Sequence, residues 1–221
     1  MPTFDLTTPR GRRRAVLDYL WQDHAYLRLG FANAHWISDE LVRTNQPWPF
    51  QLKGWADRGI KTVINLRGGK RTSFRALEVD ACQRYGLEMV DFVVASRDIP
   101  TREQVLGART LFESVRYPAL MHCKSGADRA GLMAVLYKHF RQGETVALAA
   151  SQLSLKYLHV RAGLTGVLDY WVERYLAEGA PAGLSLADWV QTPAYDPVAM
   201  KAAFRAKWWG TLLTERLLRR E

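Results

Sequence analysis

The chain has 221 residues, of which 48% are apolar and 11% aromatic, and its formal net charge is +9. This composition is typical of a globular protein with one substantial core, and it argues against a disordered chain. No apolar stretch approaches the ~18 uninterrupted residues that a membrane-spanning helix needs, so we expect no transmembrane segment.

The positive charge is concentrated at the two ends of the chain. Residues 1–14 carry four Arg and one Asp, and residues 200–221 carry six Lys or Arg and two Glu. The ends therefore supply +7 of the net charge of +9, and the long segment between them is close to neutral.

The first predicted element is a basic amphipathic helix within residues 1–34, which we treat as an N-terminal extension. Four apolar side chains follow its arginines at helical spacing, namely Val16, Leu17, Leu20 and Trp21. An anionic membrane surface attracts a helix of this kind. The alternative is that the apolar stripe packs on the rest of the chain while the charges face water.

Strands and helices alternate through the middle of the chain. Strands are predicted at residues 41–44, 61–66, 87–94 and 117–121, and helices at 52–58, 72–85, 101–115 and 132–140. Thr101 and Gln104 form a capping box where the third of these helices begins. The alternation predicts an α/β fold with a mixed, largely parallel central sheet flanked by helices.

Three additional helices are predicted towards the C-terminus. They cover residues 144–155 and 164–176 and a long piece after Asp196-Pro197, where an N-cap precedes proline at the first helical position. We assign residues 35–177 to the main domain and residues 178–221 to a basic helical extension packed on it. Phe204, Trp208, Trp209, Leu212 and Leu213 lie among basic residues there, so packing and membrane binding are again the two alternatives.

A cysteine and an arginine separated by five residues lie between a predicted strand and a predicted helix. Residues 122–131 read His-Cys-Lys-Ser-Gly-Ala-Asp-Arg-Ala-Gly. The first turn of a helix has unpaired N–H groups and the positive end of the helix dipole, so an anion binds well there. Small residues from Ser125 to Ala127 let the backbone amides turn around phosphate oxygens, and the planar fork of Arg129 grips two of them. The same field favours the nucleophilic thiolate of Cys123.

This stretch resembles the active-site loop of the protein tyrosine phosphatase superfamily, His-Cys-x5-Arg, in its dual-specificity branch. The Gly-Ala-Asp-Arg form is similar to that of bacterial members. The resemblance implies that Cys123 attacks phosphorus, that Arg129 binds the phosphoryl group and that His122 supports the thiolate. It also implies that the backbone of the loop completes a phosphate cradle, through Lys124, Ser125, Gly126, Ala127 and Asp128.

A second stretch extends the resemblance. Residues 43–47 read Arg-Thr-Asn-Gln-Pro, and residues 59–67 read Gly-Ile-Lys-Thr-Val-Ile-Asn-Leu-Arg. Both are similar to the start of the atypical dual-specificity phosphatases of plants, fungi and bacteria. Similarity therefore covers roughly residues 35–160, and it identifies residues 35–177 as a dual-specificity phosphatase-like catalytic domain.

The leaving group of a phosphate ester needs a proton, which calls for a carboxylic acid on a second loop. Our candidate is Asp98, in Ser-Arg-Asp-Ile-Pro between a strand and a helix, where related enzymes keep a movable acid loop. The alternative is that Asp98 only caps the turn into the helix. Asp128 is the second candidate, although a carboxylate beside bound phosphate is expected to orient the backbone or Arg129, or to act when protonated.

Ala130 departs from the family pattern, because most relatives carry Ser or Thr directly after the arginine. That hydroxyl assists the departing thiolate, so hydrolysis of the intermediate is expected to be slower here, or Ser125 takes part of the role. A catalytically weak phosphate-binding module remains the alternative to an enzyme.

Other charged and sulfur-bearing residues have weaker assignments. Lys124, Arg67, Lys70 and Arg71 are candidates for a basic rim around the pocket, although each is also a plausible surface charge. Cys82 is expected to be a core thiol within the helix of residues 72–85.

The expected substrate is a phosphoprotein carrying phosphotyrosine, or a phosphorylated lipid head group such as phosphatidylglycerophosphate or a lipid A phosphate. The five His residues are scattered, so we expect no metal and no other cofactor. Nucleic acid is not an expected partner, because no recognition motif accompanies the basic residues. A free thiolate predicts a cytoplasmic location, with the inner membrane as a site of peripheral association.

Overall fold

The computed structural model describes residues 4–206. Its centre is a five-stranded sheet with the order β1-β2-β5-β3-β4. Only β1 is antiparallel to its neighbour, so the predicted mixed, largely parallel sheet is confirmed. The strands are β1 (His35–Trp36), β2 (Leu41–Asn45), β3 (Thr62–Asn65), β4 (Glu88–Asp91) and β5 (Ala119–Cys123).

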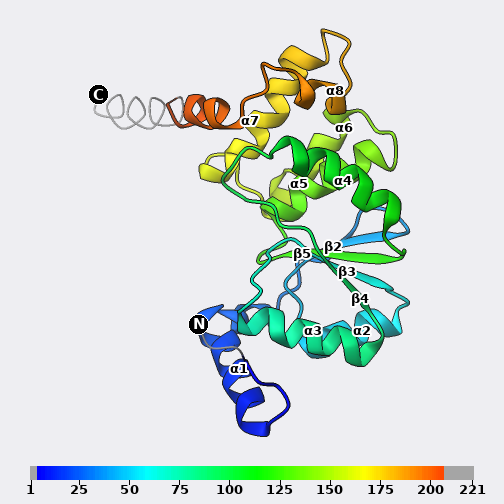
Figure 1. Cartoon of the computed structure of the whole chain (residues 1–221), viewed down its shortest axis with the longest axis vertical. Coiled ribbons are helices and arrows are strands. Elements are labelled where there is room, and N and C mark those ends of the chain that lie inside the picture. Colours follow the sequence, from blue (N-terminus) through cyan, green and yellow to red (C-terminus); the bar gives the residue numbers. More distant parts are fainter. Residues whose placement is uncertain (1–3, 207–221) are drawn as a thin grey trace.

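Helices cover both faces of the sheet (Figure 1). One face carries α1 (Pro9–Gln22), α2 (Pro49–Asp57) and α3 (Ser73–Tyr85). The other face carries α4 (Arg102–Ser114), α5 (Asp128–Phe140), α6 (Val146–Ala149), α7 (Val167–Arg174) and α8 (Leu186–Gln191). The molecule therefore has three layers, as an α/β fold requires.

The middle strand places the site. All five residues of β5 are buried, because β2 and β3 pair with its two edges in parallel. Asn45 is paired in register with Cys123, and Asn65 with His122. Parallel strands end at the same edge of a sheet, which is where such folds bind ligands, so the loops that follow β2, β3 and β5 meet there.

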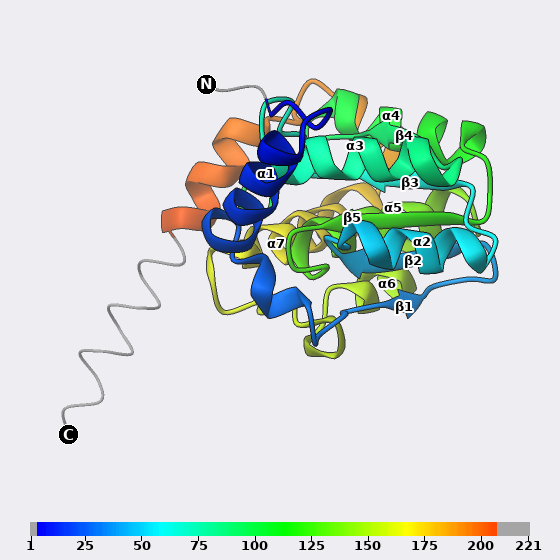
Figure 2. The same ribbon diagram turned by 90° about the horizontal axis from the view of Figure 1, so that it is seen from below.

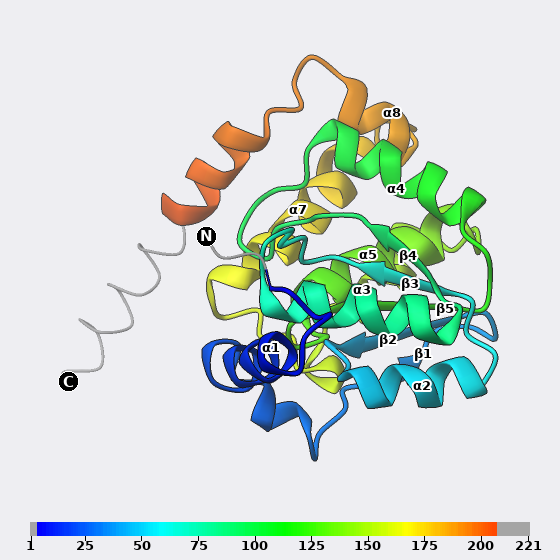
Figure 3. The same ribbon diagram turned by 60° about the horizontal axis from the view of Figure 1, so that its bottom comes forward.

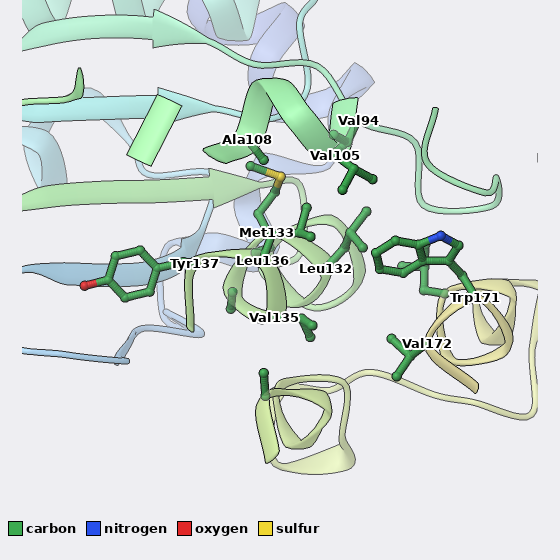
Figure 4. Packing of buried hydrophobic residues seen from close by; sticks show 14 of the residues in the cluster. Val94, Val105, Ala108, Leu132, Met133, Val135, Leu136, Tyr137, Trp171 and Val172 are labelled. Carbon is green, nitrogen blue, oxygen red and sulfur yellow. The ribbon is translucent and has the colours of Figure 1, made fainter. Parts of the chain in front are cut away.

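The larger core lies between the sheet and the helices led by α5. Eight consecutive residues of α5, from Ala130 to Tyr137, are buried. Figure 4 shows Ala108 of α4 and Trp171 of α7 pointing toward this helix. A smaller cluster on the opposite face includes Cys82, so the expected core thiol is confirmed, and burial raises the pKa of that thiol to about 12.

Capping motifs in the sequence predicted the start of a helix correctly where the helix depends on contacts between close sequence neighbours. The capping box at α4 is confirmed, because Gln104 N donates to Thr101 Oγ1 and Thr101 N donates to Gln104 Oε1. The continuous helix predicted over residues 144–155 is wrong. It is replaced by α6 and short 3₁₀ turns at Ala150–Gln152 and Leu155–Tyr157. The carbonyl of Gln152 accepts a hydrogen bond from distant Arg43 instead of continuing a helix.

The N-terminal helix packs mainly through residues outside the predicted apolar stripe. Ala15 and Tyr19 are buried, and the ring of Tyr19 lies edge-on to Trp48 with centroids 4.6 Å apart. Arg12 pairs with Asp80 of α3. Most of the predicted stripe, however, remains exposed, at 37% for Val16, 45% for Leu17 and 62% for Trp21. Of the two alternatives for the stripe, packing on the domain therefore does not apply to these three side chains.

The helix predicted after Asp196-Pro197 is confirmed at its start. Asp196 Oδ1 accepts hydrogen bonds from the amides of Val198 and Ala199, and the helix that follows is described to residue 206. Phe204 contacts the ring of Tyr170 on α7. The predicted membrane-facing residues Trp208, Trp209, Leu212 and Leu213 lie outside the described residues. No helix in residues 4–206 is long and apolar enough to cross a membrane.

Candidate active site

The loop between β5 and α5 surrounds the predicted nucleophile. Cys123 is the last residue of β5, is 1% exposed, and its Sγ accepts a hydrogen bond from Gly126 N at 3.2 Å. The helix α5 begins at Asp128, so its free N–H groups lie directly behind the loop. We call residues 123–129 the catalytic loop. The donated hydrogen bond and the positive end of the α5 dipole therefore both lie beside Cys123 Sγ.

One glycine gives the loop its curvature. Gly126 has a φ of +77°, a left-handed conformation that glycine adopts without strain. A Cβ at this position would lie 2.7 Å from the backbone nitrogen of Asn45. The close approach of β2 therefore excludes any side chain at residue 126.

A buried arginine on β2 holds the outer side of the catalytic loop. Arg43 Nη2 donates to the carbonyls of Gly126 at 2.9 Å and Ala127 at 2.7 Å. Its Nη1 donates to the carbonyl of Gln152, and the guanidinium lies 4.3 Å from the ring centroid of Tyr157. In a trans peptide the N–H points away from the C=O, so carbonyls held toward Arg43 turn the following amides to the opposite side. Burial lowers the pKa of Arg43 to about 10, opposed by the nearby Cys123, which leaves the guanidinium charged at neutral pH.

A second support for the catalytic loop comes from the N-terminal segment. Asn33 Nδ2 donates to the carbonyl of Ser125 at 3.1 Å and to that of Tyr157 at 3.0 Å. Its Oδ1 lies 2.9 Å from His35 Nε2. One side chain thus connects the catalytic loop to two other segments.

Asp128 takes part in a charged bridge. The buried imidazole of His159 lies 2.8 Å from Asp128 Oδ1 through Nδ1 and 2.7 Å from Asp169 Oδ2 through Nε2. Burial lowers the pKa of His159, but the two carboxylates outweigh it and raise that pKa to about 9. At neutral pH an imidazolium therefore fixes the first residue of α5 to the start of α7, and Asp128 is positioned to orient this turn.

The histidine before the nucleophile has an acidic neighbour. His122 is fully buried, and its Nε2 lies 2.6 Å from Glu78 Oε1 on α3, although neither ring nitrogen meets hydrogen-bond geometry. Glu78 Oε1 also accepts a hydrogen bond from Gln46 Nε2 at 3.0 Å. No motif surrounds Glu78, so its position beside His122 could not be predicted from the sequence.

Arg129 and Asp98 differ in how they are engaged. Arg129 is half-buried in the first turn of α5, and no residue in the described part of the chain forms a hydrogen bond or ion pair with its guanidinium. Asp98 is 46% exposed in its side chain and pairs with Lys201 Nζ at 2.6 Å. Lys201 belongs to the helix after Asp196, so the predicted acid loop contacts the C-terminal extension.

Two candidates for the basic rim, Arg67 and Lys124, lie beside a carboxylate from the N-terminal extension. Asp23 pairs with Arg67 at 2.5 Å and with Arg28, and it lies 3.6 Å from Lys124 Nζ. Burial would raise the pKa of Asp23, but these cations together lower it. Arg71 lines an open pocket of about 310 Å³ beside Asp23.

The roles of several of these residues could not be predicted from the sequence. Arg43 lies in a motif used for the resemblance, but its support of the catalytic loop was not foreseen. Asn33, Asp23, Glu78 and Asp169 come from segments far from residue 123 and stand in no pattern. Within residues 4–206, no group of three or more His, Cys, Asp or Glu is arranged to hold a metal.

Solved structures share the fold. Tk-PTP in its active form is 21% identical, with a TM-score of 0.52 over 64% of this chain and 97% of that chain. P. aeruginosa TpbA is 16% identical, with a TM-score of 0.52 over 76% and 91%. A putative phosphatase from Shewanella putrefaciens CN-32 is 18% identical, with a TM-score of 0.51 over 68% and 98%. No curated protein matches the chain.

A family model matches residues 39–163, more than half of the chain, and it includes β2, β5 and the entire catalytic loop. Its description is PTP-NADK, a DSP-PTPase phosphatase fused to NAD+ kinase. The chain therefore belongs to this family of atypical dual-specificity phosphatases within the protein tyrosine phosphatase superfamily.

Proposed function

We propose that the protein hydrolyses phosphomonoesters without a metal, through a phosphocysteine at Cys123. The observation that carries this proposal is the geometry of the catalytic loop. Its nucleophile accepts a hydrogen bond from Gly126 N, and its outer carbonyls are held by Arg43. Oriented amides beside a thiolate at a helix N-terminus are suited to three phosphate oxygens.

The reaction has two steps. The Cys123 thiolate attacks phosphorus and forms an S–P bond as the P–O bond to the leaving group breaks. The amides of the catalytic loop and the free guanidinium of Arg129 bind the remaining oxygens, and Asp98 gives its proton to the leaving oxygen. Water then attacks phosphorus, with Asp98 accepting its proton, and releases inorganic phosphate and the thiolate.

Ala130 bears on the second step. Alanine carries no hydroxyl, so none at this position assists the departing thiolate. Ser125 Oγ lies 3.3 Å from Ala127 N within the catalytic loop and is the available hydroxyl. This favours an enzyme whose phosphocysteine accumulates, and it keeps a weak phosphate-binding module as the second candidate.

The test is phosphate release from p-nitrophenyl phosphate in the presence of EDTA. We expect the wild type to turn over and Cys123→Ser to be inactive, while Cys82→Ser, the matched buried thiol, keeps its activity. Rapid quenching followed by mass spectrometry should find one phosphoryl group on the peptide that contains Cys123. A chain that binds vanadate but releases no phosphate and forms no such adduct would be the binding module.

For the substrate we infer a phosphorylated side chain or lipid head group. P. aeruginosa TpbA, which shares the fold, has been solved in complex with pTyr. This supports phosphotyrosine as the first protein substrate to test. The exposed surface around the catalytic loop supports a lipid substrate more specifically.

A further inference from the structure

Two segments that contact the catalytic loop expose large apolar side chains. The first follows α1 and contains the 3₁₀ turn η1 (Ala25–Arg28), and the second spans residues 155–164. Their exposed fractions are high for apolar residues, reaching 63% at Leu27 and 73% at Leu155. The members are Tyr26, Leu27, Leu29, Phe31, Leu155, Leu158, Val160 and Leu164.

Both segments border the mouth of the site. Asn33 ties the first segment to the carbonyl of Ser125, and His159 ties the second to Asp128. The Asn33 side chain also binds the carbonyl of Tyr157, so the two segments meet each other. Figures 2 and 3 show both segments at the end of the sheet where β5 stops.

The backbone of the second segment keeps its apolar residues outside. Tyr157 and His159 are buried, whereas Leu158 and Val160, which alternate with them, are each 50% exposed. Leu158 has a φ of +64°, a left-handed conformation that is unfavourable for leucine. The anchoring of its two neighbours thus holds an exposed leucine beside the site.

The exposed apolar surface continues onto α1. The ring of Trp21 lies 5.9 Å from that of Tyr26, which joins the outer face of the helix to the first segment. Together with the eight residues above, Leu17 and Trp21 form what we call the docking face. A patch of this kind beside an active site is typical of an interaction surface.

Basic side chains on the same helix supply charge. Arg10, Arg13 and Arg14 are exposed and form no ion pair within residues 4–206, in contrast to Arg12, which pairs with Asp80. With Leu17 and Asp18 they line an open groove of about 580 Å³. Unpaired arginines beside exposed Trp and Leu complement a surface that is negatively charged outside and apolar beneath.

We propose that the docking face rests on an anionic lipid surface and that the phosphate delivered to Cys123 is carried by a lipid in that surface. The substrate assignment rests on the proposed function, whereas the docking does not. Apolar side chains on both sides of the catalytic loop enter the head-group region, and the arginines bind lipid phosphates. The loop then faces phosphomonoesters at the level of the head groups.

Binding is tested by flotation with phosphatidylcholine vesicles, with and without phosphatidylglycerol. We expect the full chain to bind only the anionic vesicles, and less so as salt rises. Arg10→Gln, Arg13→Gln and Arg14→Gln together should weaken binding about 100-fold, since each basic residue near an anionic surface contributes roughly fivefold. Trp21→Ser with Leu27→Ser should also weaken it. Leu148→Ser is the control, because Leu148 is 65% exposed on α6 and lies outside the docking face.

Activity separates the two proposals. The docking variants should hydrolyse p-nitrophenyl phosphate as the wild type does but lose activity on phosphatidylglycerophosphate in vesicles. Vesicle binding without hydrolysis of any phosphoester would leave docking standing and remove the phosphatase proposal. Normal hydrolysis of p-nitrophenyl phosphate without vesicle binding would overturn the docking.

Two other outcomes would contradict the proposal. A preference for phosphopeptides that vesicles do not change would overturn the lipid substrate. A dimer that is abolished by Trp21→Ser with Leu27→Ser would assign the docking face to contact with a second copy of the chain.

Discussion

At the scale of single residues, the side chain that shapes the site is Arg43, which touches no reacting atom. Its guanidinium donates four hydrogen bonds to carbonyl and amide oxygens, two of them to carbonyls of the catalytic loop. The fork geometry is specific to arginine, because a lysine ammonium is a single point of donation on a flexible stem. The amides inside the loop are therefore oriented from its outside.

Arg43→Lys tests this role. The change keeps the charge but leaves carbonyls of the buried loop without donors, so we expect kcat/KM for p-nitrophenyl phosphate to fall about 100-fold. The free energy of unfolding should fall by about 1–3 kcal/mol, measured by urea denaturation. Arg58→Lys, on the exposed end of α2, is the control and should change neither. A stable Arg43→Lys variant with wild-type kcat/KM would show that Arg43 does not position the catalytic loop.

The bridge of His159 predicts a dependence of stability on pH. Its folded-state pKa is raised from 6.5 to about 9, so the stabilisation is fully present below pH 6.5 and is lost as the pH rises through about 9. The difference in unfolding free energy between the wild type and His159→Gln should therefore be largest in mildly acidic buffer and shrink above pH 9. Urea denaturation across this range measures it. A difference that grows with pH would contradict the charged bridge.

At the scale of elements, sequence motifs predicted a helix or loop correctly where its residues contact close neighbours in the sequence. Cys123 and Arg129 could be paired from sequence because one loop carries both, and the start of α4 followed from its capping box. The region after α6 could not be predicted, since Gln152 gives its carbonyl to an arginine 109 positions away in sequence. Asn33 and Asp23 could not be predicted either, because they contact the site through tertiary interactions that produce no periodic pattern in the sequence.

The acid loop is the second element whose role can be tested. Asp98→Asn should lower kcat on an alkyl phosphate by about 100-fold or more, because an alkoxide needs a proton to leave. The effect on p-nitrophenyl phosphate, whose leaving group is stable as an anion, should be smaller. Lys201→Ala is the matched control, since it removes the same ion pair and keeps the carboxylate. Equal losses in both variants would show that the ion pair matters and that Asp98 is not the acid.

At the scale of the whole molecule, the N-terminal extension is part of the fold. It buries Tyr19 against Trp48, and it places Asp23 among the cations beside the catalytic loop. The sequence revealed an amphipathic helix but not which face would pack. The packing face depends on α3, because Asp80 pairs with Arg12 and Leu77 packs in one cluster with Tyr19.

Two aromatic residues on α1 provide a test of whether the N-terminal extension packs on the domain. Tyr19→Ala should lower the free energy of unfolding by about 3–5 kcal/mol, because it removes a fully buried ring. Trp21→Ala, two positions along and 62% exposed, should change it by less than about 0.5 kcal/mol. Thermal or urea denaturation of both variants gives the comparison. Similar stabilities would mean that the extension is not packed on the domain in solution.

The tight approach of Gly126 to β2 also determines how this enzyme can be altered. A Cβ at residue 126 meets the backbone of Thr44 and Asn45, which cannot yield without moving a strand of the sheet. Its neighbour Ser125 is exposed, and Lys124 is partly so. Lys124 is therefore a more accessible position for variation than residue 126, where a randomised library should return glycine alone.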